Sequence, residues 1–561
     1  MTGRLHKKLD APDSKLVTQA GSDQQPFGAT ASSEQSWSAL VVAAAAGALL
    51  LKLLIALKTY GTNDVYAWER FAVWSRYLGV AVYRELWDFN HPPFMITVIH
   101  SIEWLANLTH LPFPFWLRVP AIVADTCVVW IMYQTLRRRT RESSIRWAIV
   151  LLALAPPLIL ISGFHGNTDS VMICLLLVSL YLAENGSQTW AAGAVFGAAM
   201  SVKIVPLIII PVVLFHYTST RKRIEFLGAV AIVWAALCSP FLLQDPLAVL
   251  KQVFGYDSYF GHWGLSYLTD QTSHRFPWLE PASTTHEKYG TYFLAASTWA
   301  LAFWMNRLSP KPRLFSQAGA TFFLFLTLSN GFGVQYLAWL APWVVELGVV
   351  PAALLYASSG VFLFLVYNFW SQGFPWYIAD SDLVGDYQGR LDPFQLVCWM
   401  SVAGTLFLAC NRMRTRVERT GTWTTGAVSL TLALSLALLV FCLTMPVRFT
   451  PEPKIRSDKT TLAFIQARSD LGLSAVLYKR GRYRDSIAVV QEALRGLPDS
   501  DIRFNVIRAE GQNTIAAGLS QLRMWDEAIL AAREALRFNP DYDVARKNLA
   551  WLIAQRDFGR K

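Results

Sequence analysis

An aspartate, Asp64, comes a few residues after the first long apolar run of the chain, within the stretch Gly61–Phe71. A second polar cluster, Asp88–Pro93, contributes Asp88 and His91 later in the same segment. Carboxylates and a histidine held beside a membrane span indicate chemistry at the boundary between bilayer and water. A polar loop with a helix cap would use the same residue types, because Asn and Asp are common N-cap residues. Asp64 alone does not decide between these interpretations.

Further polar residues occur in otherwise apolar sequence. His165, Asn167 and Asp169 lie in a short segment between two apolar runs, where Gly-Asn-Thr-Asp is also ordinary turn chemistry. Lys203 lies in the apolar stretch 190–217. A lysine at membrane depth is costly unless it faces a cavity or an anion, although a long side chain can also extend to the membrane surface. Both interpretations of Lys203 stay open.

The second long polar segment, residues 244–290, offers two more cationic candidates, His262 and Arg275. Either side chain could contact an anionic group of a substrate. His262 could equally cap its loop, and Arg275 could equally contact lipid head groups. The six cysteines fall in or beside apolar runs and none has metal-ligand spacing, so we interpret them as core thiols.

The composition identifies the class of protein to which these candidates belong. Of 561 residues, 53% are apolar and 16% charged. Apolar runs of roughly 15–25 residues alternate with short basic clusters, which is typical of a polytopic helical membrane protein. The net charge of +11 lies largely in those clusters. The preference of positive loops for the cytoplasm explains this charge better than nucleic-acid binding does, so we expect no nucleic-acid partner.

The chain divides into three parts. Residues 1–36 are polar and predict a disordered cytoplasmic tail. Residues 37–445 predict about thirteen transmembrane helices with long outer segments at 58–117 and 244–290. Within the first of these, residues 94–108 are short for a span and predict a helix in the interface. An odd number of spans places the N-terminus in the cytoplasm and the C-terminus outside it.

Residues 446–561 differ from the rest because they are charged and have helical periodicity. Two similar units begin near Gly481 and near Trp525, each with small residues at matched positions and a proline at its end. This pattern resembles the tetratricopeptide repeat, with a longer linker between the units than usual. A small soluble α-helical domain of this kind barely buries a core alone, so we expect it to dock on the membrane domain or on a protein partner.

The membrane part resembles the GT-C glycosyltransferases. Asn63-Asp64 with Trp68-Glu69-Arg70, followed by Asp88–Pro93, is similar to the first outer loop of that superfamily. The two later matches, His165–Asp169 and Ser201–Pro206, resemble loops of the dolichol-linked glucosyltransferases and of the GPI mannosyltransferase type. A further segment, Val334–Pro342, resembles one that recurs in bacterial members. The resemblance covers about residues 37–445.

This resemblance implies an all-α membrane enzyme that moves a hexose, mannose or glucose, from a polyprenyl-phosphate carrier to an acceptor hydroxyl with inversion. It implies that Asp64 is the catalytic base, and that the acceptor is a glycan, lipid or protein. We expect the substrate-binding residues to be Asp88, His91, His165, Asn167, Asp169, Lys203, His262 and Arg275. The first loop lacks the Asp-X-Asp triplet of some members, because Thr62 and Tyr66 occupy the flanking positions. We therefore expect neither a cofactor nor an obligatory metal ion.

Other functions remain as alternatives. A lipid-linked glycan ligase or polymerase would use an Arg or His pair of a later loop in place of Asp64. A transporter is disfavoured because no repeated halves are visible. A non-catalytic scaffold would present the C-terminal domain to partners and would tolerate substitution of Asp64. For the glycosyltransferase we expect the inner membrane of a bacterium as its location.

Overall fold

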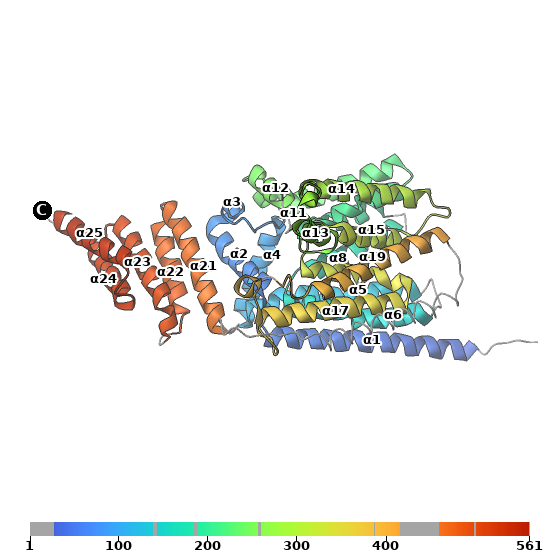
Figure 1. Cartoon of the computed structure of the whole chain (residues 1–561), viewed down its shortest axis with the longest axis horizontal. Helices are drawn as coiled ribbons and strands as arrows, with labels where there is room; N and C mark the ends of the chain where they lie inside the picture. The colour runs from blue at the N-terminus through green and yellow to red at the C-terminus, as the bar shows by residue number, and fades with distance from the viewer. Residues whose placement is uncertain are drawn as a thin grey trace, which may run out of the picture.

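The protein is described from a computed structural model that covers residues 27–137, 143–184, 188–255, 260–385, 387–415, 459–498 and 501–559. Most of the predicted N-terminal tail and the predicted last span near residues 424–444 lie outside these ranges. The described chain forms a helical bundle with a row of five helices attached at one end (Figure 1). The predicted all-α class is confirmed for these residues, whose two strands have two residues each.

Six helical segments of the described chain are long and apolar enough to cross a membrane. They are Trp37–Lys58 in α1 (Phe27–Lys58), Phe113–Arg137 (α5), Ser144–His165, Thr220–Leu242 (α11), Val349–Trp370 (α17) and Asp392–Thr415 (α19). The third of these combines α6 (Ser143–Ala153), α7 (Pro156–Leu160) and a π-helical turn, η2 (Ile161–His165). These spans make the chain an integral membrane protein. The count of about thirteen crossings stays a prediction.

Shorter helices complete the bundle. Among the apolar ones, α8 (Asp169–Glu184) packs against α9 (Thr189–Val202), and α9 packs against α11. Further short helices include α3 (Val82–Glu85), η3 (Val205–Ile209), α10 (Ile210–His216), α12 (Pro246–Phe254), α15 (Leu314–Leu328), η5 (Val334–Tyr336), α16 (Leu337–Leu340), η6 (Trp343–Leu347) and α18 (Ser381–Val384). Pro206 and Pro211 lie in the first turns of η3 and α10, where a missing amide N–H costs little.

Two helices follow α1 on the same side of the bundle. The first, α2 (Asn63–Leu78), buries Trp68 and Phe71 on its apolar face. The second, α4 (Phe94–Thr109), begins directly after Pro93 and packs on α2 and α5. It extends one residue beyond the helix expected at 94–108, and at 16 residues it is shorter than the six spans.

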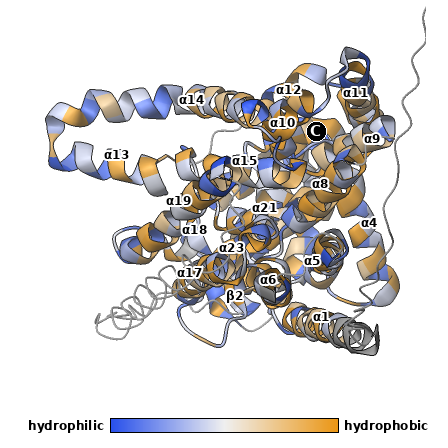
Figure 2. Ribbon diagram, turned by 90° about the vertical axis from the view of Figure 1, so that its right-hand side faces the viewer, coloured by the Kyte–Doolittle hydropathy of each residue, from blue (hydrophilic) through white to orange (hydrophobic). Residues whose placement is uncertain are grey.

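The second long outer segment, residues 244–290, is mostly helical in its described residues. After α13 (Gly264–Arg275), the helix α14 runs unbroken from Glu280 to Arg307, so residues 280–290 of the expected segment belong to it. Pro281 lies in its first turn, and only residues compatible with a helix follow. Figure 2 shows α13 and α14 projecting to one side of the bundle, with hydrophilic residues at their far end.

The described part of the C-terminal domain contains five α-helices. They are α21 (Lys459–Lys479), α22 (Tyr483–Arg495), α23 (Asn505–Gln521), α24 (Trp525–Phe538) and α25 (Asp543–Gly559). Each packs on the next, and small buried residues such as Ala528 and Ala532 let the helices approach closely. The first helix, α21, also contacts α2 of the membrane domain. The tetratricopeptide assignment stays a prediction.

Candidate active site

Thr62, two residues before Asp64, fixes the start of α2. The Thr62 hydroxyl oxygen accepts a hydrogen bond from the Asp64 amide at 3.3 Å and donates one to the His165 carbonyl at 2.8 Å. Residues Gly61–Thr62 form strand β1, which pairs in parallel with β2 (Ile378–Ala379). The loop before α2 is therefore fixed to two distant segments of the chain.

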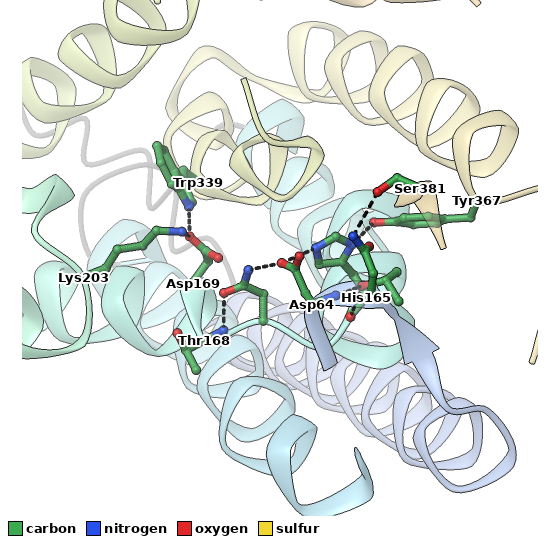
Figure 3. Close-up of polar contacts among 11 residues, drawn as sticks. Asp64, His165, Thr168, Asp169, Lys203, Trp339, Tyr367 and Ser381 are labelled. Atoms are coloured by element: carbon green, nitrogen blue, oxygen red, sulfur yellow. Dashed lines mark hydrogen bonds and ion pairs between the residues drawn. The ribbon is translucent and has the colours of Figure 1, made fainter. Parts of the chain in front are cut away.

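The Asp64 carboxylate accepts two hydrogen bonds on one oxygen (Figure 3). Asn167 Nδ2 lies 2.8 Å from Oδ2, and His165 Nε2 lies 3.0 Å from the same atom. No other described residue donates a hydrogen bond to this carboxylate. The side chain is 32% exposed. Oδ1 is thus available to accept a proton from a bound molecule.

The histidine is fixed in turn by a tyrosine. His165 is 3% exposed at its side chain, and its Nδ1 lies 3.1 Å from the Tyr367 hydroxyl. Since an ionised carboxylate only accepts, Nε2 donates to Asp64, and the Tyr367 hydroxyl contacts the other ring nitrogen. This assignment gives His165 an orienting role toward Asp64.

Opposing effects set the pKa of Asp64. Burial raises it, but the charge and hydrogen bond of His165, the charge of Lys203 and the hydrogen bond of Asn167 together lower it below the ordinary value. The carboxylate is therefore ionised at neutral pH.

Lys203 belongs to the same site. It follows the last residue of α9 in an extended conformation, and its Nζ donates to Asp169 Oδ1 at 2.8 Å. The ammonium also lies 5.3 Å from the ring centres of Tyr336 and Trp339. Trp339 donates its indole N–H to Asp169 as well. Of the two interpretations of Lys203, the structure supports an interior partner rather than an extended side chain at the membrane surface.

Asp88 and His91 contact side chains of α2. The His91 ring packs against the Trp68 ring at a tilt of 36°, with ring centres 4.2 Å apart. Burial first, and then the charge of Lys203, lower the pKa of His91 to about 3, so this ring is neutral at physiological pH. Asp88 accepts a hydrogen bond from Arg70. Asp382, in α18, has a pKa raised by burial and by the charge of Asp64.

His262 and Arg275 have other contacts. The His262 carbonyl accepts from Gln395 Nε2 at 2.7 Å, just before α13. Arg275 is exposed in the last turn of α13, with its guanidinium 5.9 Å from the Phe276 ring centre. These two contacts are made with residues other than Asp64, His165 and Asn167.

A buried arginine joins the loops that carry the site. Arg118, in α5, is 0% exposed and binds the end of α1 together with the segment before His165. Its guanidinium donates to the carbonyls of Ala56 (2.8 Å), Thr59 (2.6 Å), Gly163 (3.1 Å), Phe164 (3.3 Å) and Pro114 (2.8 Å) and to the Thr59 hydroxyl (3.0 Å). Arg118, Tyr367 and Asp382 were not predicted from the sequence. Arg118 could have been, because an arginine in apolar sequence is rare.

Two glycines allow these loops to meet. Gly61 and Gly166 have φ values of +114° and +82°, which disfavour side chains. A Cβ on Gly166 would lie 2.2 Å from Val65 Cγ2, and one on Gly61 would lie 2.7 Å from the Phe164 carbonyl oxygen. Only glycine fits both positions without displacing its neighbours.

The described residues contain no group of three or more His, Cys, Asp or Glu side chains that could hold a metal ion. The described side chains at this site are a positioned carboxylate beside a histidine, an amide and a lysine. Such a carboxylate can take a proton from a hydroxyl, and the lysine adds positive charge nearby.

Known proteins are similar to the part of the chain that holds this site. The family described as GPI transamidase subunit PIG-U matches residues 44–260. A dolichyl pyrophosphate Glc1Man9GlcNAc2 alpha-1,3-glucosyltransferase of Gibberella zeae is 24% identical, over 29% of this chain and 38% of its own. GPI mannosyltransferase 1 of Trypanosoma brucei brucei is 25% identical, over 29% of this chain and 37% of its own. The chain thus spans less than two fifths of the length of these relatives.

We expect Arg118→Lys to destabilise the protein strongly, although it keeps the charge. Lysine carries its three donors on one nitrogen atom and cannot reach all the acceptors of the planar guanidinium group. Each buried carbonyl that loses its donor costs about 1–3 kcal/mol. Thermal unfolding in detergent should show a lower midpoint for Arg118→Lys. The control Arg137→Lys, at the exposed end of the same helix, should unfold as the original does. Equal midpoints for both variants would contradict the role of Arg118.

Proposed function

We propose that this protein is a membrane glycosyltransferase, which moves a hexose from a polyprenyl-phosphate carrier to an acceptor hydroxyl with inversion. The observation that carries this proposal is the Asp64 carboxylate, ionised, oriented through Oδ2 and accessible at Oδ1. The similarity of part of the chain to a glucosyltransferase and a mannosyltransferase supports hexose transfer. Residues 44–260 also match the GPI transamidase subunit PIG-U family.

In the proposed reaction, the acceptor oxygen attacks the anomeric carbon of the donor sugar. The bond between that carbon and the phosphate oxygen breaks, and the electron pair leaves with the lipid phosphate. A sugar hydroxyl holds its proton at neutral pH, so Oδ1 of Asp64 takes this proton as the new bond forms. Direct attack from the side opposite the phosphate inverts the anomeric configuration.

The leaving phosphate gains negative charge during the reaction, and Lys203 is a cation whose charge acts on Asp64. Its side chain is 15% exposed, and its ammonium donates to Asp169. Preorganised positive charge of this kind stabilises the transition state without reorganisation. His91 and Asn167 are proposed to contact the sugar, His91 as a neutral ring. His262 and Arg275 remain candidates for binding the carrier lipid farther from the reacting atoms.

We further propose that the site lies on the extracytoplasmic face of a bacterial inner membrane. Asp64 follows the end of α1, and α2, which carries it, contacts the C-terminal domain. Both parts therefore belong on one side of the bilayer. The acceptor is a glycan, lipid or protein reached from that side.

Asp64→Asn should reduce sugar transfer by about 10²–10⁴-fold, because the amide keeps the shape of the carboxylate but cannot take a proton. Transfer would be measured with purified protein and a radiolabelled polyprenyl-phosphate hexose. Asp270→Asn, a carboxylate of α13 whose side chain is 28% exposed, serves as the matched control and should retain full activity. Undiminished turnover in Asp64→Asn would reject the assignment of the base.

The acid side of the pH profile tests the environment of Asp64. Its lowered pKa keeps it ionised, so this group should cause no loss of kcat/KM between about pH 5 and pH 8. His165→Phe removes the largest lowering effect and leaves the burial that raises the pKa, so activity should now fall as pH falls within this range. His100→Phe on α4 is the matched control. An unchanged profile in His165→Phe would contradict the coupling.

A second candidate is a non-catalytic subunit of a membrane complex, because the matching family is described as a transamidase subunit. That function needs the fold and its contacts but no proton acceptor. A variant at Asp64 that folds and complements a deletion strain in full would favour the subunit over the enzyme.

A further inference from the structure

A cavity of about 200 Å³ lies where the C-terminal domain meets α2, apart from the Asp64 carboxylate. One wall belongs to α2 and the other to α21 and α22. Its lining residues are Tyr66, Glu69, Arg70 and Val73 of α2, and Ala463, Gln466, Ala467, Ser469, Asp470, Glu492, Ala493 and Gly496 of the C-terminal domain. Neither domain forms this cavity alone.

Hydrogen bonds between the domains fix the two walls. Glu69 accepts from Gln466 Nε2 at 2.7 Å and from the Tyr60 hydroxyl at 2.6 Å. The Tyr66 hydroxyl donates to the Ile465 carbonyl at 3.4 Å. Farther along the same face, Arg480 pairs with Glu85 at 2.6 Å. The cavity is therefore a built feature of the interface rather than a loose gap.

The lining suits a neutral, hydroxyl-rich ligand. Arg70 and Gln466 carry N–H donors, whereas Asp470 and Glu492 offer carboxylate acceptors. A hydroxyl both donates and accepts, so a sugar ring can use donors and acceptors together. Val73 adds an apolar surface for the ring carbons. The lining holds more carboxylates than cations, which disfavours the phosphate of the donor.

The cavity is large enough for one sugar ring. Its volume is several times the roughly 30 Å³ share of one liquid water, and it falls below the roughly 300–1,000 Å³ of pockets for drug-sized ligands. Burial first, and then the charges of Glu492 and Glu69, raise the pKa of Asp470 to about 7. A ligand that donates a hydrogen bond there without adding negative charge is favoured.

Arg70 connects the cavity to the reaction centre. It lines the cavity and also donates to Asp88. Arg70 and Asp88 both act electrostatically on Asp382, as Asp64 does. Along α2, the six residues from Asp64 to Arg70 correspond to about 9 Å. This distance suits two consecutive units of a glycan.

We propose that this cavity, named here the junction cleft, binds a neutral sugar unit of the acceptor while the adjoining hydroxyl is presented to Asp64. The acceptor role depends on the proposed glycosyltransferase function. The C-terminal domain then completes the acceptor site, and the donor is bound by the membrane domain.

The test measures binding of methyl α-mannopyranoside and methyl α-glucopyranoside to the full-length protein in lipid nanodiscs, by saturation-transfer NMR. Asp470→Asn and Glu492→Gln remove cleft acceptors at nearly constant shape, and Ala463→Phe fills the cleft without removing a polar group. We expect each to weaken binding at least tenfold. Asp543→Asn and Glu534→Gln, exposed carboxylates of the same domain, are the matched controls and should bind as the original does.

Transfer kinetics separate this inference from the proposed function. The cleft variants should raise KM for the acceptor at least tenfold with little change in kcat, whereas Asp64→Asn should lower kcat and still bind the methyl hexosides. If the original protein does not bind the methyl hexosides, or if all three cleft variants bind them equally well, the junction cleft is not a sugar site. The proposed function would still stand. Binding that depends on Asp470 in a protein without transferase activity would overturn the acceptor role and the proposed function together.

Discussion

The guanidinium of Arg118 is the interaction on which the candidate site depends most. It is fully buried in a transmembrane helix, and it binds carbonyls at the end of α1 and in the segment before His165. Each of these carbonyls would otherwise be buried without a donor, which is costly inside a membrane protein. One side chain thereby fixes two loops that are far apart in sequence. Gly61 and Gly166 let these loops close over Val65, and the carboxylate of Asp64 meets His165 and Asn167 as a result.

Burial alone would favour a protonated Asp64, and its partners reverse that preference. His165, Lys203 and Asn167 keep the carboxylate ionised, while Tyr367 keeps the histidine oriented. Asp169 and two aromatic rings hold Lys203 in turn. Two hydrogen-bonded groups result, one around Asp64 and His165 and one around Lys203 and Asp169, and the charge of Lys203 couples the second to Asp64. An arrangement of this kind suits a base that must work at neutral pH beside a departing anion.

The sequence predicted the membrane class, the helix at 94–108 and most residues of the site, because charged residues in apolar sequence are rare and informative. It could not predict which of them meet. His165 and Lys203 approach Asp64 through tertiary packing, whereas His262 and Arg275, similar in type, have contacts elsewhere. Tyr367 and Trp339 were missed as partners because aromatic residues are common in membrane helices. The continuous α14 was missed because its polar first turns resemble a loop.

The Asp64 carboxylate is proposed to stand beside the anomeric carbon of a lipid-linked sugar. A structure of the protein in a lipid nanodisc with a bound, unreactive polyprenyl-phosphate hexose analogue tests this directly. We expect the anomeric carbon in front of Oδ1 of Asp64 and the phosphate on the side of Lys203. A sugar phosphate bound instead near His262 or Arg275, out of reach of Asp64, would contradict it.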